Sequence, residues 1–236
     1  MQSAELGLMK LWKFDSGIYP VIPGMDIALG DYGYWKDSQW CRIGNIGEIQ
    51  GYPNVLSILT DSLNQHVTES LLVDFVGTAN ANADADAALK AGTELIFKKK
   101  NSQMFIGDLK EYKCYSSINM EIKPLLEKLA ECGIWEDEYW LAYYVVRSDN
   151  FISIRSKEAG VSIKIDADLD LTSLNQVKAG LKVQLDRNSR SIETVANKDG
   201  LSFAGAKFIS LDKKGLFRRT VKVKYNSADP EEVLLS

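Results

Sequence analysis

Strict alternation of apolar and polar residues is the feature that most constrains this fold. From Val161 to Leu171 the odd positions are apolar, and the even positions between them are polar. A strand places successive side chains on opposite faces, whereas a helix would spread these residues around its surface. The pattern therefore predicts a two-faced strand over Val161–Leu171, with Val161, Ile163, Ile165 and Leu169 on its apolar face.

A second alternating stretch runs from Val73 to Phe97 and includes "FVGTANANADADAALKAGTELIF". Small or apolar residues occupy its odd positions, and polar residues occupy most of its even positions. Alanine also favours helices, so a short helix over Asp84–Ala91, ended by Gly92, remains open. The alternative is one long ribbon, or two strands with a bend. Strands of ordinary domains average about 5–6 residues, so an uninterrupted ribbon would indicate a special role.

Two helices are expected elsewhere in the chain. The first is predicted over Asn54–Gln65, because apolar residues recur there at helical spacing: Val55, Ile58, Leu59 and Leu63. The second lies in "SSINMEIKPLLEKLAECG" and has a clear apolar stripe formed by Ile118, Ile122, Leu125, Leu126 and Leu129. Pro124 suits the first turn of this helix, so its regular part begins near Lys123, and Gly133 suits its C-terminal cap.

Turn residues mark hairpins between the remaining strands. A hairpin is expected in "DYGYWKDSQWCRIG", with its turn at Lys36-Asp37-Ser38, and Asn101-Ser102 is expected at the tip between Ile96-Phe97 and Met104–Ile106. "LFRRTVKVKY" is expected to be the last strand. The economical fold is α+β: one twisted, mainly antiparallel β-sheet with long strands and a few packed helices. We expect a single domain over residues 1–225 and a short tail over 226–236.

Composition narrows the function classes. The chain has 236 residues and a net charge of −4, which does not suit a binder of polyanions. The three cysteines, Cys41, Cys114 and Cys132, have no metal-ligand spacing and are expected to be reduced, half-buried thiols. The sequence contains no run of about 18 apolar residues, so we expect no transmembrane helix.

The sequence carries no decisive catalytic signature. His66 is the only histidine, so any serine-type triad or Cys–His pair would have to use it. Motifs for phosphate, dinucleotide or zinc-protease sites are missing. Carboxylates cluster at Glu136–Glu138, which we expect to form an exposed turn. A second cluster, Asp166, Asp168 and Asp170, shares one strand face, where calcium binding and a solvated face both remain open. We therefore expect no enzyme, and nominate no catalytic, cofactor-binding or metal-binding residue.

A basic cluster stands out near the C-terminus of this acidic chain. The cluster consists of Lys213, Lys214, Arg218, Arg219, Lys222 and Lys224. Such a cluster either attracts the phosphates of lipid or nucleic acid, or protects an edge strand against aggregation. We expect lipid headgroups rather than nucleic acid as the partner.

The long alternating stretches match the requirements of membrane-spanning strands. Such a strand needs about 9–11 residues, with apolar side chains facing lipid. A protein that rearranges into a multi-chain barrel needs only a few such ribbons in each chain. The candidate membrane-strand residues are Leu95, Phe97, Val161, Ile163, Ile165, Leu169 and Leu171.

The succession "TELIFKKKNSQMFIGDLKEYKCYSS", a helix, and "IWEDEYWLAYYVVRSDNFISIRSKEAGVSIKI" resembles the order of elements in bacterial gasdermin-like pore-forming proteins, over roughly residues 70–225. The resemblance implies a twisted antiparallel sheet with packed helices, a short inhibitory C-terminal segment removed by a protease, and oligomeric membrane pores. Many bacterial members carry a lipidated N-terminal cysteine, whereas the first cysteine here is Cys41.

Three functions follow as expectations. The first is a latent pore-forming effector of cell death or bacterial defence. It would be cytoplasmic until a protease removes the tail, and would then assemble as a homo-oligomer on anionic membranes. Val233, Leu234 and Leu235 are the residues expected to dock the tail. The second is a non-enzymatic binding or structural module, and the third is an enzyme of unknown class.

Overall fold

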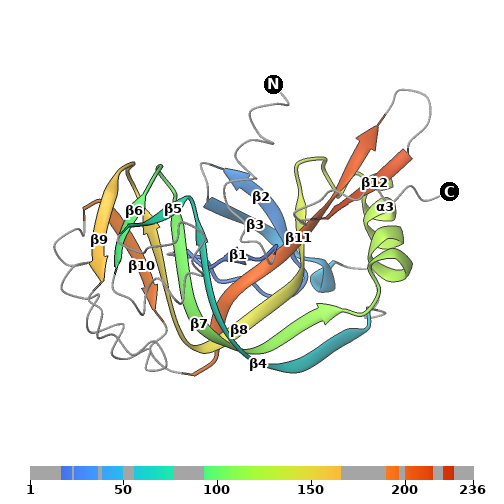
Figure 1. Cartoon of the computed structure of the whole chain (residues 1–236). Helices are drawn as coiled ribbons and strands as arrows, with labels where there is room; N and C mark the ends of the chain where they lie inside the picture. The colour runs from blue at the N-terminus through green and yellow to red at the C-terminus, as the bar shows by residue number, and fades with distance from the viewer. Residues whose placement is uncertain are drawn as a thin grey trace.

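The computed structural model describes residues 17–22, 24–36, 39–49, 56–76, 93–165, 190–196, 200–214 and 220–225. Two sheets account for most of this part of the chain, and every strand pairing described is antiparallel. The long central strands carry a small sheet at one end and a helix at the other (Figure 1).

The large sheet has nine strands, and its centre is the long strand β8, Trp140–Ser156. β7 (Gln103–Tyr115) pairs with β8 on one side, and β4 (Ile58–Leu71) pairs with β7. The other strands pair around this centre: β1 (Tyr19–Pro20), β2 (Asp31–Lys36), β3 (Gln39–Asn45), β10 (Ile192–Ala196), β11 (Ser202–Lys214) and β12 (Thr220–Tyr225).

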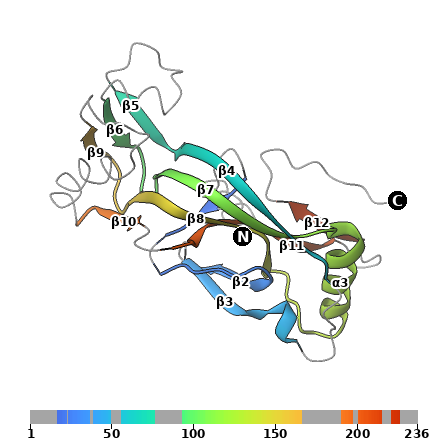
Figure 2. The same ribbon diagram turned by 90° about the horizontal axis from the view of Figure 1, so that it is seen from below.

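The small sheet has three strands in the order β5 (Val73–Val76), β6 (Thr93–Phe97) and β9 (Val161–Ile165). These strands continue, after short breaks, from β4, into β7 and from β8 respectively. The small sheet is therefore connected to the large one by three neighbouring strands. Figure 2 shows both sheets from below, with β5, β6 and β9 grouped beyond the ends of β4, β7 and β8.

The helical part follows β7. A π-helical turn, η2 (Ile118–Ile122), leads into the α-helix α3 (Lys123–Glu131). The hydroxyl of Ser117 accepts a hydrogen bond from the backbone N–H of Met120, and Gly133 ends the helix with φ = +72°. Ile122, Leu126 and Leu129 are completely buried against the large sheet. The expected start near Lys123 and the expected apolar stripe are thus confirmed.

The predicted helix over Asn54–Gln65 is wrong. The described part of that segment belongs to β4, which begins at Ile58 and pairs with β7 from Ile58–Tyr115 to Leu71–Gln103. A bulge between Ser62 and Gln65 shifts the register. Ile58 and Leu59 lie before the bulge and are 56% and 51% exposed, so they form no buried helical stripe.

The prediction of a single sheet with a few helices also needs correction. The strand-dominated, mainly antiparallel α+β class is confirmed, but the structure has two sheets. Among the described residues it has one α-helix, with a 3-10 turn, η1 (Ile46–Glu48), and η2 beside it. The hairpin at Lys36-Asp37-Ser38 is confirmed by the pairing of Lys36 with Gln39. The possible helix over Asp84–Ala91 lies outside the described residues.

Candidate functional site

The membrane-strand candidates that the structure describes meet on one face of the small sheet. Leu95 pairs with Ile163, and Phe97 pairs with Val161. Leu95, Phe97 and Ile163 have no exposed surface, and Val161 packs beside them. Ile165 lies in β9, and Leu169 and Leu171 lie outside the described residues.

The large sheet covers this apolar face. Met104 and Ile106 of β7 and Ile152 and Ile154 of β8 form one core with the small sheet, and all four are buried. The two sheets are therefore layers of a local sandwich. Apolar burial of this kind stabilises by roughly 25 cal/mol per Å² and favours the folded-over arrangement in water.

The opposite face of the small sheet is mostly polar, but Ile96 and the 44% exposed Val76 also lie on it. Glu94 pairs in register with Lys164, and the Ser162 hydroxyl donates a hydrogen bond to the Glu94 carboxylate. The Lys98 ammonium lies 2.6 Å from the Asp74 carboxylate. The β6–β9 pair is thus two-faced in space, as the alternation in sequence predicted.

The two strands that connect the layers turn over the same number of residues. The β7–β8 pairing ends at Gln103 with Arg155, and the β6–β9 pairing begins at Phe97 with Val161. Residues 98–102 on one strand and 156–160 on the other separate these pairs. The register of the small sheet is consequently the continuation of the register of the large sheet. We call these two segments the corner.

Backbone hydrogen bonds join the two strands at both ends of the corner. The N–H of Asn101 donates to the carbonyl of Ser156 at 2.7 Å, and the N–H of Ser156 donates to the carbonyl of Ser102 at 2.9 Å. At the far side the N–H of Gly160 donates to the carbonyl of Phe97 at 2.7 Å. Between these ends the Ser102 N–H donates to the carbonyl of Lys99 in its own strand at 3.1 Å, and the Lys157 N–H donates to the carbonyl of Ser191 at 2.8 Å.

Arg155 fastens the corner from inside. Its Nε and Nη2 donate to Asn101 Oδ1 at 3.1 and 2.5 Å, and its Nη1 lies 3.8 Å from a carboxylate oxygen of Glu193 on β10. Arg155 is only 9% exposed, and burial lowers its pKa while Glu193 raises it. A buried guanidinium is stable only when its donors have partners, so these contacts hold Asn101 in place.

Two residues with unusual backbone conformations lie between the two sheets. Leu72 and Asn101 have φ = +56° and +69°, and they are the non-glycine residues with positive φ among the described part of the chain. Leu72 joins β4 to β5, and its carbonyl accepts from the N–H of Lys98 at 3.0 Å. Positive φ is unusual for a bulky side chain such as leucine, which marks this junction as strained.

A buried polar group ties the corner to the segment after β1. Gln103 Nε2 donates to the Val21 carbonyl at 3.1 Å and to Ser153 Oγ at 2.7 Å, and Ser153 Oγ donates to the same carbonyl at 2.9 Å. Gln103 and Ser153 are buried. Gln103 Oε1 has no hydrogen-bond partner among the described residues, so this buried network is only partly satisfied.

His66 belongs to a row of polar side chains across three strands. Its Nδ1 lies 2.8 Å from Asp108 Oδ1, and Asn150 Nδ2 donates to Asp108 Oδ2 at 3.5 Å. His66 and Asp108 are register partners, as are Asp108 and Asn150. Thr68 Oγ1 lies 3.4 Å from His66 Nε2, at the long limit of a hydrogen bond. The geometry is that of a cross-strand polar ladder, and it nominates no nucleophile.

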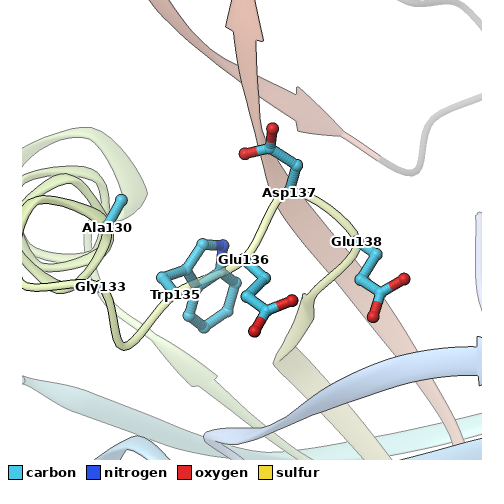
Figure 3. Close-up of a pocket in the computed structure, with 6 residues that line it drawn as sticks. All are labelled: Ala130, Gly133, Trp135, Glu136, Asp137 and Glu138. Atoms are coloured by element: carbon cyan, nitrogen blue, oxygen red, sulfur yellow. The ribbon is translucent and has the colours of Figure 1, made fainter.

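A shallow depression of about 500 Å³ lies between the end of α3 and the start of β8. Glu136, Asp137 and Glu138 form one wall as an exposed turn, as expected, and Ala130, Gly133 and Trp135 complete the lining (Figure 3). Trp135 is buried, and its indole N–H has no partner among the described residues. In Figure 3 the side chains of Glu136 and Glu138 extend to one side of the chain and that of Asp137 to the other. Within the described residues no group of three potential metal ligands converges.

The basic cluster maps to the β11–β12 hairpin. Lys213 pairs with Val221 and Lys214 with Thr220, while Lys222 and Lys224 lie in β12. Other predicted groups lie outside the described residues: Arg218, Arg219, the tail residues Val233, Leu234 and Leu235, and the carboxylates Asp166, Asp168 and Asp170. In the part of the chain that is described, no helix is long and apolar enough to cross a membrane.

The sequence reasoning named Asn101 as a turn residue but missed Arg155 and Gln103, which flank the corner. The turn at Asn101-Ser102 is present, but the strands that it joins belong to different sheets. β7 is buried on both faces, since Phe105 is 4% exposed and its neighbours Met104 and Ile106 are completely buried. β8 is likewise buried on both faces at Phe151 and Ile152, so the change of face at the corner leaves no clear mark in the sequence.

Comparison with known structures gives a distant likeness. No protein-family profile matches the sequence. No curated protein matches it significantly. The structure resembles a bacterial gasdermin. That protein, from Bradyrhizobium tropiciagri, is 14% identical, and the alignment covers 89% of this chain and 86% of the other with a TM-score of 0.34. The weak resemblance to bacterial gasdermins that the sequence predicted is therefore confirmed. It assigns no role to any residue.

Proposed function

We propose that the protein is a latent membrane-permeabilising effector whose strands insert as part of an oligomeric pore. The observation that carries the proposal is the β6–β9 pair. It has a continuous apolar face of Leu95, Phe97, Val161 and Ile163 and an opposite face bearing Glu94 and Lys164. A strand pair in a membrane barrel needs such faces, one toward lipid and one toward a water-filled lumen.

The latent state follows from the packing of that apolar face. In this fold it is covered by β7 and β8, so it offers no apolar surface to a membrane. A membrane-active form therefore requires the two layers to separate. We propose that the tail over residues 226–236 restrains this separation, and that a protease removes the restraint. The latent protein would be cytoplasmic, and the active form would bind anionic membranes through the basic cluster.

The tail suits a removable restraint energetically. Val233, Leu234 and Leu235 would stabilise a docked tail by at most roughly 1.5–3 kcal/mol each before ordering costs are subtracted. A total of this size shifts a two-state equilibrium strongly, yet one cut abolishes it. Because β12 ends at Tyr225, removing residues 226–236 takes away no described strand or helix.

The test is dye release from liposomes of anionic lipid, with neutral liposomes as the reference. We expect silence from the full chain, and dye release together with oligomer formation from a chain ending at Tyr225. Full-length protein with Val233, Leu234 and Leu235 all replaced by Asp should also release dye, because its tail cannot dock. A shortened chain that stays monomeric, folded and harmless to both kinds of liposome would refute the proposal.

The alternative is a non-enzymatic binding module. The depression lined by Glu136–Glu138 favours it, because an acidic hollow suits a cationic partner. Silence of every shortened chain on liposomes, combined with a partner whose binding is lost on replacing Glu136 and Glu138 by Gln, would favour this module. An enzyme is the least supported reading, since the His66 row nominates no nucleophile.

A further inference from the structure

We propose that residues 93–108 and 150–165 are one two-stranded ribbon folded in half at the corner, and that it opens by straightening rather than by unfolding. The proposal concerns the protein in water and holds whether or not the chain permeabilises membranes. The proposal rests on the register in which these two segments pair. Pairing runs from Asp108 with Asn150 to Gln103 with Arg155, and then in the same register from Phe97 with Val161 to Thr93 with Ile165.

Equal corner lengths make straightening possible without loss of register. Residues 98–102 lie opposite 156–160, so neither strand has a residue in excess when the corner extends. Hydrogen bonds already cross the corner between Asn101 and Ser156 and between Ser156 and Ser102. The ladder on both sides would survive the motion, while only the contacts between the two layers and inside the corner would be lost.

Arg155 holds the corner in its bent form, and we call it the latch. It joins Asn101 of one corner segment to Glu193 of β10, a strand of the large sheet. Asn101 holds a positive φ, a conformation that an extended strand would not need. Loss of the guanidinium frees Asn101 to extend, while the β8–β10 pairing from Ile152 with Ala196 to Ser156 with Ile192 remains. The population of the open ribbon then rises.

β5 cannot follow the straightened ribbon. Between the two layers the β4–β5 strand has a single residue, Leu72, where its partner β6–β7 has the five residues 98–102. The β5–β6 register is therefore not a continuation of the β4–β7 register. Straightening must release Val73–Val76 from β6, while β6 and β9 remain paired with each other.

Thiol labelling combined with amide exchange distinguishes straightening from unfolding. We would replace Cys41, Cys114 and Cys132 by Ser and introduce Ile163→Cys as the reporter of the buried face. Arg155→Met should raise the labelling rate at position 163 by about tenfold or more, the scale expected when a charged group loses its hydrogen bonds. Amides of Thr93–Phe97 and Val161–Ile165 should keep their protection, and those of Val73–Val76 should exchange faster.

Arg42→Met is the matched control. Its guanidinium also pairs with a carboxylate, Asp31 at 2.9 Å, but in the β2–β3 hairpin. It should leave labelling at position 163 unchanged. If Ile163→Cys prevents folding, Ile154→Cys on the facing layer reports the same opening, because Ile154 is also completely buried.

Two results would overturn the proposal. If Arg155→Met raises labelling and the exchange of β6 and β9 amides together, the small sheet unfolds and does not straighten. If it changes neither, Arg155 is not a latch and the ribbon does not open at this corner. Because no membrane enters the experiment, failure here is separate from failure of dye release by the shortened chain.

Discussion

Replacing Ile163 by Asp tests whether the apolar face of the small sheet stabilises the folded protein. Ile163 has no exposed surface and packs with Leu95 and with Ile152 and Ile154 of the facing layer. Loss of a buried isoleucine side chain alone costs about 2–5 kcal/mol. The carboxyl group adds the cost of burying a polar group without a partner, roughly 1–3 kcal/mol. The sum is a large part of the about 5–15 kcal/mol that stabilises a typical domain.

The pH dependence of this loss identifies its cause. Burial raises the pKa of the introduced carboxyl in the folded state above the value of about 3.9 that it has in the unfolded chain. The folded protein then binds the proton more tightly, so the destabilisation is greatest above the raised pKa and shrinks as the pH falls toward 4. Ile163→Asn has a similar size but no titrating group, and its loss should not recover in this window.

Urea unfolding of the wild type and the Asp, Asn and Val variants at pH 7 and pH 5 measures these effects. Ile163→Val should lose only about 0.5–1.5 kcal/mol, because one methyl group is removed. The reasoning is refuted if Ile163→Asp unfolds at the wild-type urea concentration. It is also refuted if the Asp and Asn variants show the same change between the two pH values.

Two further predictions concern other parts of the fold. Reversing Lys213, Lys214, Arg218 and Arg219 to Glu should abolish binding to anionic vesicles, since each basic charge contributes about 1 kcal/mol near such a surface; tight, salt-sensitive binding to nucleic acid without vesicle binding would contradict this. Leu126→Ala should lower the free energy of unfolding by about 2–5 kcal/mol, because Leu126 is completely buried between α3 and the large sheet; a loss under 1 kcal/mol would show that the helix is not part of the cooperative core.

Features that repeat within a single element were predictable from the sequence. The stripe containing Ile122, Leu126 and Leu129, the proline in the first turn and the glycine after the last turn all act within one helix. The alternation around Ile163 likewise acts within one strand. Such local patterns identify the element because its own geometry decides which side chains share a face.

Features that depend on pairing between distant strands were not predictable in this way. β4 is a strand because it pairs with β7 on both sides of its bulge, and that pairing outweighs the helical spacing of Ile58, Leu59 and Leu63. Arg155 is important because Asn101, more than fifty positions earlier in the chain, turns back beside it. No local pattern in the sequence marks either relation, since both arise only when the sheets form.

The change of apolar positions at the corner explains why the folded-over state dominates in water. In the bent ribbon, odd-numbered Leu95 and Phe97 and even-numbered Met104 and Ile106 share one core. In an extended strand odd and even positions point to opposite faces, so straightening would move these pairs apart. Leu95 would then join the face of Phe105, which packs in the other core, and Met104 would lose its cover. Each open ribbon therefore exposes apolar side chains on two faces at once, which water disfavours.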